Sequence, residues 1–168
     1  EFSAASLGVV LGAGREFANH GAVSAGLRRS VGQATILIGD PDTPDVDFDT
    51  GEAFLDLSID RLDSLYFPRQ GYFLRNRYVD SREALGADRD FKQYDFDGLY
   101  ARTFGAHAVQ AGLRYHTTLS GTLPLQSRYR LGGYSRLVGF QPNELSGQHY
   151  AVLVGGYNYR IAQLVNQP

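Results

Sequence analysis

Hydrophobic and polar residues alternate with a period of two along most of the chain. Between Val109 and Ser120, hydrophobic side chains occupy most odd positions, whereas Gln110, Arg114 and His116 occupy even ones. Successive side chains of a β-strand point to opposite faces, so this alternation predicts half-buried strands, and a helical stripe does not fit it. The same pattern predicts about seven strands of roughly 10–14 residues. The expected strands lie near residues 3–14, 21–36, 51–61, 71–82, 90–104, 107–120 and 149–163.

No segment predicts a helix, so the expected fold class is all-β. The connections alternate in length: those near residues 14–21 and 104–107 are short, and those at 37–50, 83–89 and 121–148 are longer. Short turns on one rim and long loops on the other are typical of an antiparallel transmembrane β-barrel of the outer-membrane type. A soluble barrel can alternate too, but its apolar face lies inside.

The two faces of the expected strands differ in chemistry. One face mixes Arg, His, Gln, Asp and Ser with Gly, which suits a water-filled lumen, and the other is aliphatic with Tyr, which suits lipid. A set of tyrosines is expected at the lipid interface or in strand packing, because no basic residues interleave it as nucleic-acid stacking would need. The set comprises Tyr94, Tyr100, Tyr115, Tyr157 and Tyr159.

Composition narrows the function classes further. The 168 residues are 43% hydrophobic, and Lys+Arg 16 against Asp+Glu 18 gives a net charge of −2, so no basic field predicts a nucleic-acid partner. The chain has no Cys, which excludes a disulfide framework, a thiolate metal site and a thiol nucleophile. No apolar stretch is long enough for a transmembrane helix.

The expected strand number bears on completeness. About seven strands do not make the even-numbered closed barrel of bacterial outer-membrane proteins. The chain starts at Glu1 without a signal peptide and ends at Pro168 directly after an expected strand. We therefore expect residues 1–168 to be a partial barrel domain, truncated at both ends.

Two segments carry more specific patterns. The first runs from Asp60 to Gly71, where Pro68 interrupts a strand ladder and Gly71 permits a positive φ, so a structured turn is expected. The second runs from Leu131 to Gln141 inside the 121–148 connection, for which no strand is predicted. Connections of such length tend to be functional.

Together these segments resemble the outer-membrane protein assembly factor superfamily, also called the bacterial surface antigen family. The resemblance covers roughly residues 51–163. The family's Asp-x-x-Asp and Phe-Pro-x-x-Gly turn corresponds to Asp60, Asp63, Phe67, Pro68 and Gly71. Its lumenal loop, with a Gly-Gly start and a Val/Leu-Arg-Gly-Phe/Tyr tip, corresponds to Gly132, Gly133, Arg136, Leu137, Val138, Gly139 and Phe140.

The loop departs from the family pattern at one position. Val138 stands where the family carries an arginine, and Arg136 lies two residues earlier. In the family that arginine pairs with an acid on a strand that would follow Pro168. The Gly-Gly-x-x-Arg-Leu-x-Gly-Phe/Tyr tip resembles the branch whose barrels are fused to an N-terminal patatin-like lipid hydrolase.

The resemblance implies a function at the outer membrane of a Gram-negative bacterium. We expect a barrel module that anchors or helps export an attached passenger, such as a patatin-like hydrolase outside this chain. The alternative is the barrel of an outer-membrane protein insertase or secretion pore. The expected partners are outer-membrane lipid and lipopolysaccharide, the rest of the barrel, and a covalently attached N-terminal passenger or periplasmic domain. A self-contained barrel enzyme or a soluble ligand-binding barrel is the third possibility.

No catalytic site is predicted, so this chain is expected not to be an enzyme and to need no cofactor. His116 and Ser120 share a face, but residues four apart on a strand are roughly 13 Å apart, too far for a catalytic pair. The segments 22–26 and 97–99 are near misses to the Gly-x-Ser-x-Gly and Asp-Gly motifs of patatin-type hydrolases.

Two other patterns are also expected to be structural. The acidic stretch 40–49 lacks the Gly and carboxylate spacing of a calcium loop, so a solvated outer loop is expected there, with weak cation bridging to lipopolysaccharide as the alternative. Residues 12–15 lack the third glycine and the helix of a dinucleotide fingerprint, so they are expected to end a strand.

Overall fold

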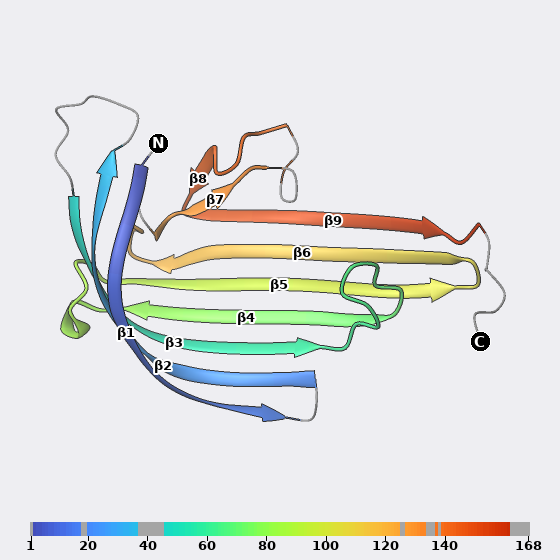
Figure 1. Ribbon diagram of the computed structural model, residues 1–168, viewed down its shortest axis with the longest axis horizontal. Helices are drawn as coiled ribbons and strands as arrows, with labels where there is room; N and C mark the ends of the chain where they lie inside the picture. Colours follow the sequence, from blue (N-terminus) through green and yellow to red (C-terminus); the bar gives the residue numbers. More distant parts are fainter. Residues whose placement is uncertain are drawn as a thin grey trace.

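A seven-stranded antiparallel sheet makes up most of the molecule (Figure 1). The computed structural model describes residues 2–17, 20–36, 46–124, 127–133, 137 and 139–161. The strands of the large sheet are β1 (Phe2–Phe17), β2 (Gly21–Ile36), β3 (Val46–Asp60), β4 (Gly71–Ser81), β5 (Phe91–Phe104), β6 (His107–Ser120) and β9 (His149–Tyr159). A second sheet holds β7 (Tyr129–Leu131) and β8 (Leu145–Gly147), and η2 (Glu83–Leu85) is one turn of 3₁₀-helix.

The predicted all-β antiparallel class is confirmed, with differences at element ends. The first strand continues to Phe17, and β3 begins at Val46, inside the connection predicted at 37–50. The 121–148 connection contains the β7–β8 hairpin, although no strand was expected there. β9 ends at Tyr159, and residues 162–163 of the last predicted strand lie outside the described residues.

The early start of β3 has a physical reason. Residues 46–50 continue the ladder with β2, but here Phe48 is buried on the polar face of the sheet and Asp49 lies on the opposite face, bonded to Arg29. Where a strand pair extends beyond the apolar band of the sheet, the side chains on its outward face do not contact lipid and need not be apolar. The alternation that identifies the membrane part of a strand therefore disappears in this extension.

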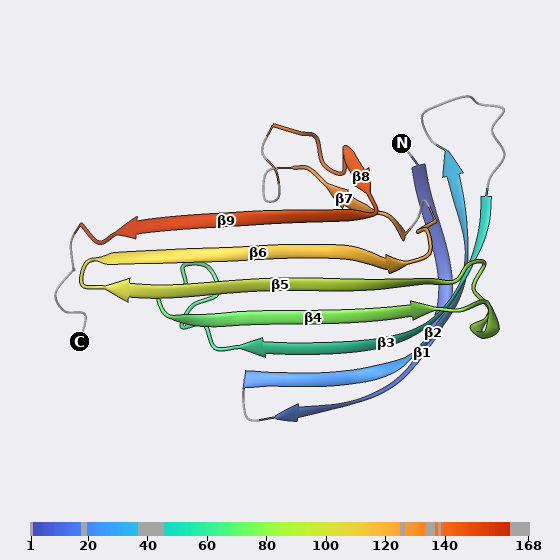
Figure 2. The ribbon, with the colours of Figure 1, turned by 180° about the vertical axis from the view of Figure 1, so that it is seen from behind.

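Strand order follows the sequence, so the sheet is a meander that curls on itself. In Figure 1, β1 and β2 curl in front of the other strands, and the 61–70 segment also lies in front of β4–β6; Figure 2 shows that segment from behind. Among the described residues, β1 pairs only with β2 and β9 only with β6, so the sheet is open at these two edges. It is consistent with part of a barrel wall.

One face of the sheet is apolar and exposed. Its large side chains include Leu7, Leu11, Leu55, Leu113 and Leu153, the last of which is 83% exposed. An aromatic group lies on this face toward the short-turn rim and comprises Phe17, Tyr100, Phe104, Tyr157 and Tyr159. An apolar band bordered by aromatic rings is the surface that a barrel presents to lipid.

Buried side chains gather at the other rim, under the longer connections. Val79, Phe91 and Leu123 are buried there, and the 82–90 connection packs back on β3 through the bond from Arg82 N–H to Gly51 O. Among the residues that the structure describes, no helix is long and apolar enough to cross a membrane.

Candidate functional site

Charged side chains form a row across the polar face of the sheet. The strand registers place Asp56 opposite Arg77, Arg77 opposite Asp95, and Asp95 opposite His116. Directly opposed side chains of neighbouring strands are close enough to interact, and Arg77 Nε lies 3.7 Å from Asp56 Oδ1. Acidic and basic groups therefore alternate along the row and compensate one another.

A second row runs beside the first. Arg75 is opposite Asp97, and Asp97 is opposite Arg114. Arg114 Nε lies 3.9 Å from Asp97 Oδ1. The structure thus places Arg114 and His116 on one polar face, as the alternation of β6 predicts, and it assigns them acidic neighbours on β5.

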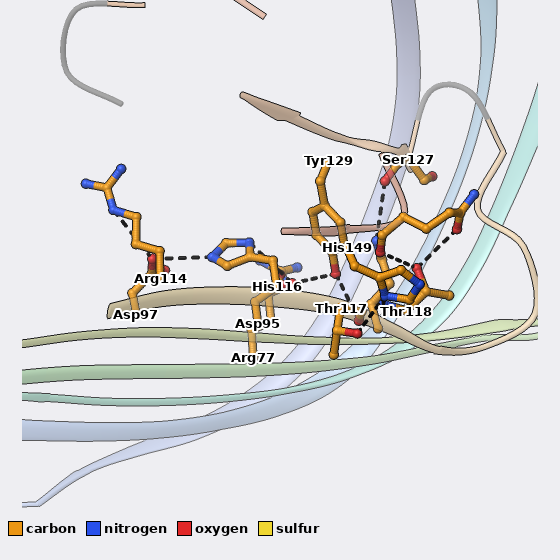
Figure 3. A network of polar contacts seen from close by, with 12 residues as sticks. Arg77, Asp95, Asp97, Arg114, His116, Thr117, Thr118, Ser127, Tyr129 and His149 are labelled. Carbon is orange, nitrogen blue, oxygen red and sulfur yellow. Dashed lines mark hydrogen bonds and ion pairs between the residues drawn. The ribbon is translucent and has the colours of Figure 1, made fainter. Parts of the chain in front are cut away.

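His116 joins the two rows (Figure 3). Its Nδ1 lies 3.5 Å from Asp95 Oδ1, and its Nε2 lies 3.3 Å from Asp97 Oδ1. The imidazole stacks on Tyr150 with ring centroids 4.6 Å apart, and the ring of Tyr129 meets it edge-on at 5.4 Å. The histidine is therefore held between two carboxylates and two aromatic rings, which differs from the geometry of a hydrolase triad.

The 121–148 connection lies over this polar face. From β7, Tyr129 donates its hydroxyl proton to Asp95 Oδ1 at 2.7 Å, and Gln93 Nε2 donates to Ser127 O at 3.3 Å (Figure 3). Burial and then the hydrogen bond to Asp95 raise the pKa of Tyr129 well above its usual value. The hydroxyl consequently remains a donor at every physiological pH, and we call the Tyr129–Asp95 contact the loop latch.

The base of the connection is also fixed. Leu123, 1% exposed, donates its N–H to Gln148 Oε1 at 3.0 Å, and Thr118 Oγ1 donates to Gln148 O at 2.9 Å. Thr117 Oγ1 lies 2.7 Å from His149 Nδ1 (Figure 3). The two ends of the connection are therefore bonded to each other and to β6.

The described residues at the two ends of the predicted loop motif meet each other. Gly132, Gly133 and Gly139 have φ of 128°, 96° and 102°, which L side chains rarely adopt. A Cβ at Gly132 would lie 2.2 Å from Gln141 O. Gly133 N–H donates to Phe140 O at 3.1 Å, so the Gly-Gly start meets the end of the motif.

Within this motif, Leu137 N–H donates to Gly133 O at 2.9 Å. Arg136 and Val138 lie outside the described residues, and the consequence of valine at the family's arginine position stays a prediction.

The predicted turn motif is held by its two aspartates. Asp60 Oδ1 accepts from Leu62 N–H at 3.0 Å. Asp63 Oδ1 accepts from the N–H groups of Arg69 at 2.7 Å and Gln70 at 3.0 Å. The hydrogen bonds from Arg69 and Gln70 lower the pKa of the Asp63 carboxyl. Both acidic positions of the motif therefore organise the backbone of the turn.

The rest of the turn motif places the segment on the sheet. Gly71 has φ 110°, and a Cβ there would lie 1.9 Å from Arg61 O. Pro68 O accepts from Gln110 Nε2 at 2.7 Å, which binds the turn to β6. The Phe67 side chain is 75% exposed. The turn and the 121–148 connection consequently both lie on the polar face.

Two other sequence candidates lie in strands: residues 12–15 are inside β1, which continues to Phe17, and Asp47 and Asp49 of the expected outer loop belong to β3. Asp47 and Asp49 bond to Gln33 and Arg29 at 3.1 and 3.0 Å, whereas positions 40–45 of the acidic stretch lie outside the described residues. No group of three or more His, Cys, Asp or Glu side chains in the described part of the chain could hold a metal ion.

Sequence reasoning missed Tyr129 and Tyr150 as partners of His116. A weak signal precedes the Gly-Gly pair, because the alternation of Tyr129, Arg130 and Leu131 is that of a short strand. Three residues are too few to establish a period.

Comparison with protein families supplies an independent result. The chain matches the family model of the Omp85 superfamily domain over residues 2–164. A search among curated proteins finds no match.

Proposed function

The chain belongs to the Omp85 superfamily, and from that premise we propose that it is an outer-membrane barrel module that anchors or helps export an attached passenger. Domains of this family are non-enzymatic β-barrels of the Gram-negative outer membrane, with roles in protein insertion or secretion. The passenger that we propose is a patatin-like lipid hydrolase, because the Gly132–Phe140 tip resembles that branch of the family. This chain would then carry no catalytic residues of its own.

The observation that carries the proposal is the position of the 121–148 connection. The connection is bonded to the polar face through Tyr129, which donates to Asp95, and through Ser127, which accepts from Gln93. The start of β9 lies there too, because Tyr150 stacks on His116. A connection fixed there occupies the space through which a polypeptide would pass. Export through such a barrel would require the loop latch to open, whereas anchoring would require it to stay closed.

The exposed apolar face supports the membrane location. Aliphatic side chains cover it, and aromatic rings border it at the short-turn rim. Its proposed partners are outer-membrane lipid and, at the long-loop rim, lipopolysaccharide. Among the described residues no strand pairs with the outer edges of β1 and β9. Unpaired N–H and C=O groups are costly in lipid, so we propose that the rest of the barrel pairs with these edges.

The alternative function is that of an outer-membrane protein insertase or secretion pore. Family membership supports it as much as the proposal, and here the covalent partner would be a periplasmic domain instead of a passenger. The two functions differ in which proteins need the barrel. An anchoring or export barrel is needed only by its attached domain, whereas an insertase or secretion pore is needed by other proteins, including other barrels.

Depletion of the full-length protein in its Gram-negative host separates them. We expect the attached domain to disappear from the outer-membrane fraction or from the protease-accessible cell surface, while other outer-membrane barrels keep their abundance. Quantitative mass spectrometry of outer membranes measures both. A general fall in other barrel proteins would favour the insertase and contradict the proposal.

A further inference from the structure

A cavity of about 980 Å³ lies between the two segments that cover the polar face. Tyr66 and Pro68 of the 61–70 turn line one side of it, and Tyr129 and Asn143 of the 121–148 connection line another. Strands β4, β5, β6 and β9 contribute the remaining wall. Ligand sites commonly measure roughly 300–1,000 Å³, so this volume exceeds what a single small anion needs.

The charges around this cavity are unbalanced. Four arginines line it, namely Arg75, Arg114, Arg128 and Arg130, and Asp97 is the only carboxylate among the described lining residues. Asp97 already contacts Arg114 and His116. On the neighbouring part of the polar face, Arg28 and Arg77 have acidic partners in Glu52 and Asp56. The surplus positive charge is therefore local, although the whole chain is net −2.

Two of the four arginines have no polar partner in the described part of the chain. Arg75 projects from β4 and Arg128 from the 121–148 connection, and both side chains are exposed. The side-chain amide of Asn143 likewise has no partner among the described residues. Guanidinium groups bind carboxylates through paired hydrogen bonds, and an amide can bond to a peptide backbone.

We propose that this cavity is a binding site for the carboxylate side chains of an extended, acidic polypeptide segment. The inference rests on the proposed function, because a polypeptide is the molecule that an export barrel receives. Arg75 and Arg128 would pair with the carboxylates, Asn143 would bond to the backbone, and the rings of Tyr66 and Tyr129 would pack on the segment. The turn and the connection would form the two ends of one site.

Peptide binding to the full-length protein in nanodiscs tests this assignment. The probes are a fluorescein-labelled Asp-Ser repeat peptide and a Lys-Ser repeat peptide of the same length, followed by fluorescence anisotropy. We expect the acidic peptide to bind more tightly than the basic one. In the variant Arg75→Gln/Arg128→Gln its affinity should fall by about tenfold or more, because two charge-assisted contacts are lost.

The matched control is Arg89→Gln/Arg102→Gln. It removes the same charge from two exposed arginines that do not line the cavity, and it should leave affinity within about twofold, since distant exposed charges are screened by salt. The conservative variant Arg75→Lys/Arg128→Lys should keep part of the affinity, because it keeps both positive charges and loses only the paired hydrogen bonds of the guanidinium groups. Circular dichroism of the Gln variant shows that it is folded. Equal losses of peptide affinity in Arg75→Gln/Arg128→Gln and in the control would mean that only the net charge of the protein matters. That result would overturn the assignment of the binding site.

Inorganic phosphate is the competitor that distinguishes a peptide site from a small-anion site. We expect inorganic phosphate at the same concentration as the peptide to leave the bound acidic peptide in place. Full displacement of the peptide by phosphate would overturn the polypeptide assignment. Absence of acidic-peptide binding would do the same. Peptide binding is measured without export, so its outcome is independent of the depletion experiment. If the acidic peptide binds specifically but depletion lowers the abundance of other barrel proteins, the binding site is retained and the passenger function is rejected.

Discussion

The 61–70 turn and the 121–148 connection are both bonded to the polar face of the sheet, through Gln110 and Tyr129 respectively, but they differ in how their own backbone is organised. The turn is built by short-range bonds, in which Asp60 and Asp63 accept N–H groups a few residues away. The connection is held by side chains from distant parts of the chain, as in the bond from Tyr129 to Asp95. The turn therefore depends mainly on its local sequence, and the connection depends on the assembled wall.

The largest effect is expected at the end of the turn. Gly71→Ala should destabilise the protein by about 2 kcal/mol or more, because φ 110° and a Cβ 1.9 Å from Arg61 O cannot both persist. Thermal unfolding of the full-length protein in detergent, followed by circular dichroism, measures it. Gly105→Ala is the control, since φ is 63° there and no heavy atom lies within 4 Å of a Cβ. Equal losses for both would show that the close approach at Gly71 is unimportant.

An intermediate effect is expected at the loop latch. Tyr129→Phe removes the 2.7 Å bond to Asp95 and keeps the ring beside His116, so it should weaken docking of the connection by about 1–2 kcal/mol. Trypsin cleavage after Arg128 and Arg130 should become several-fold faster, because local opening exposes those bonds.

Tyr94→Phe is the matched control for the latch. It also removes one 2.7 Å tyrosine bond, to Asn76 Oδ1, but the bond lies between β4 and β5 and away from the connection. Its cleavage rate should equal that of the wild type. If Tyr129→Phe behaves like this control, the connection is held by other contacts and the distinction between the two segments weakens.

The smallest effect is expected for Asp63→Asn and depends on pH. Hydrogen bonds from Arg69 and Gln70 lower the folded-state pKa of Asp63 below 3.8, so its stabilising contribution is complete above about pH 4 and is lost as pH falls through the folded value. Amide hydrogen exchange in the 61–71 segment should be faster in Asp63→Asn than in the wild type at neutral pH, and the difference should vanish in acid. Asp60→Asn, whose acceptor serves Leu62, should leave the Arg69 and Gln70 amides protected.

The contrast between the segments also explains what the sequence could predict. The alternation of hydrophobic and polar residues predicted all seven long strands, because each strand has one apolar and one polar face. It missed residues 46–50, where the strand extends beyond the apolar band and Phe48 and Asp49 exchange the usual faces. The turn could be predicted because Asp60, Asp63 and Gly71 act on their own backbone.

The contacts of the connection could not be predicted in the same way. His116 was placed on the polar face by its parity, but its position between Asp95 and Asp97 depends on the register of β5 against β6. Of its aromatic partners, Tyr129 lies within the long connection and Tyr150 lies beyond it. A single sequence contains no local signal for such pairs.

The meander also constrains how the chain folds. Five of the six strand pairs in the large sheet join strands across the connections after β1, β2, β3, β4 and β5, whereas β6 must find β9 across residues 121–148. Closing a flexible segment of that length costs about 3 kcal/mol of chain entropy. The β7–β8 hairpin and the bonds at Gln148 shorten the free segment before β9 pairs. Tyr129→Phe should therefore slow the addition of β9 during refolding, so that one hydroxyl group influences assembly kinetics as well as the finished wall.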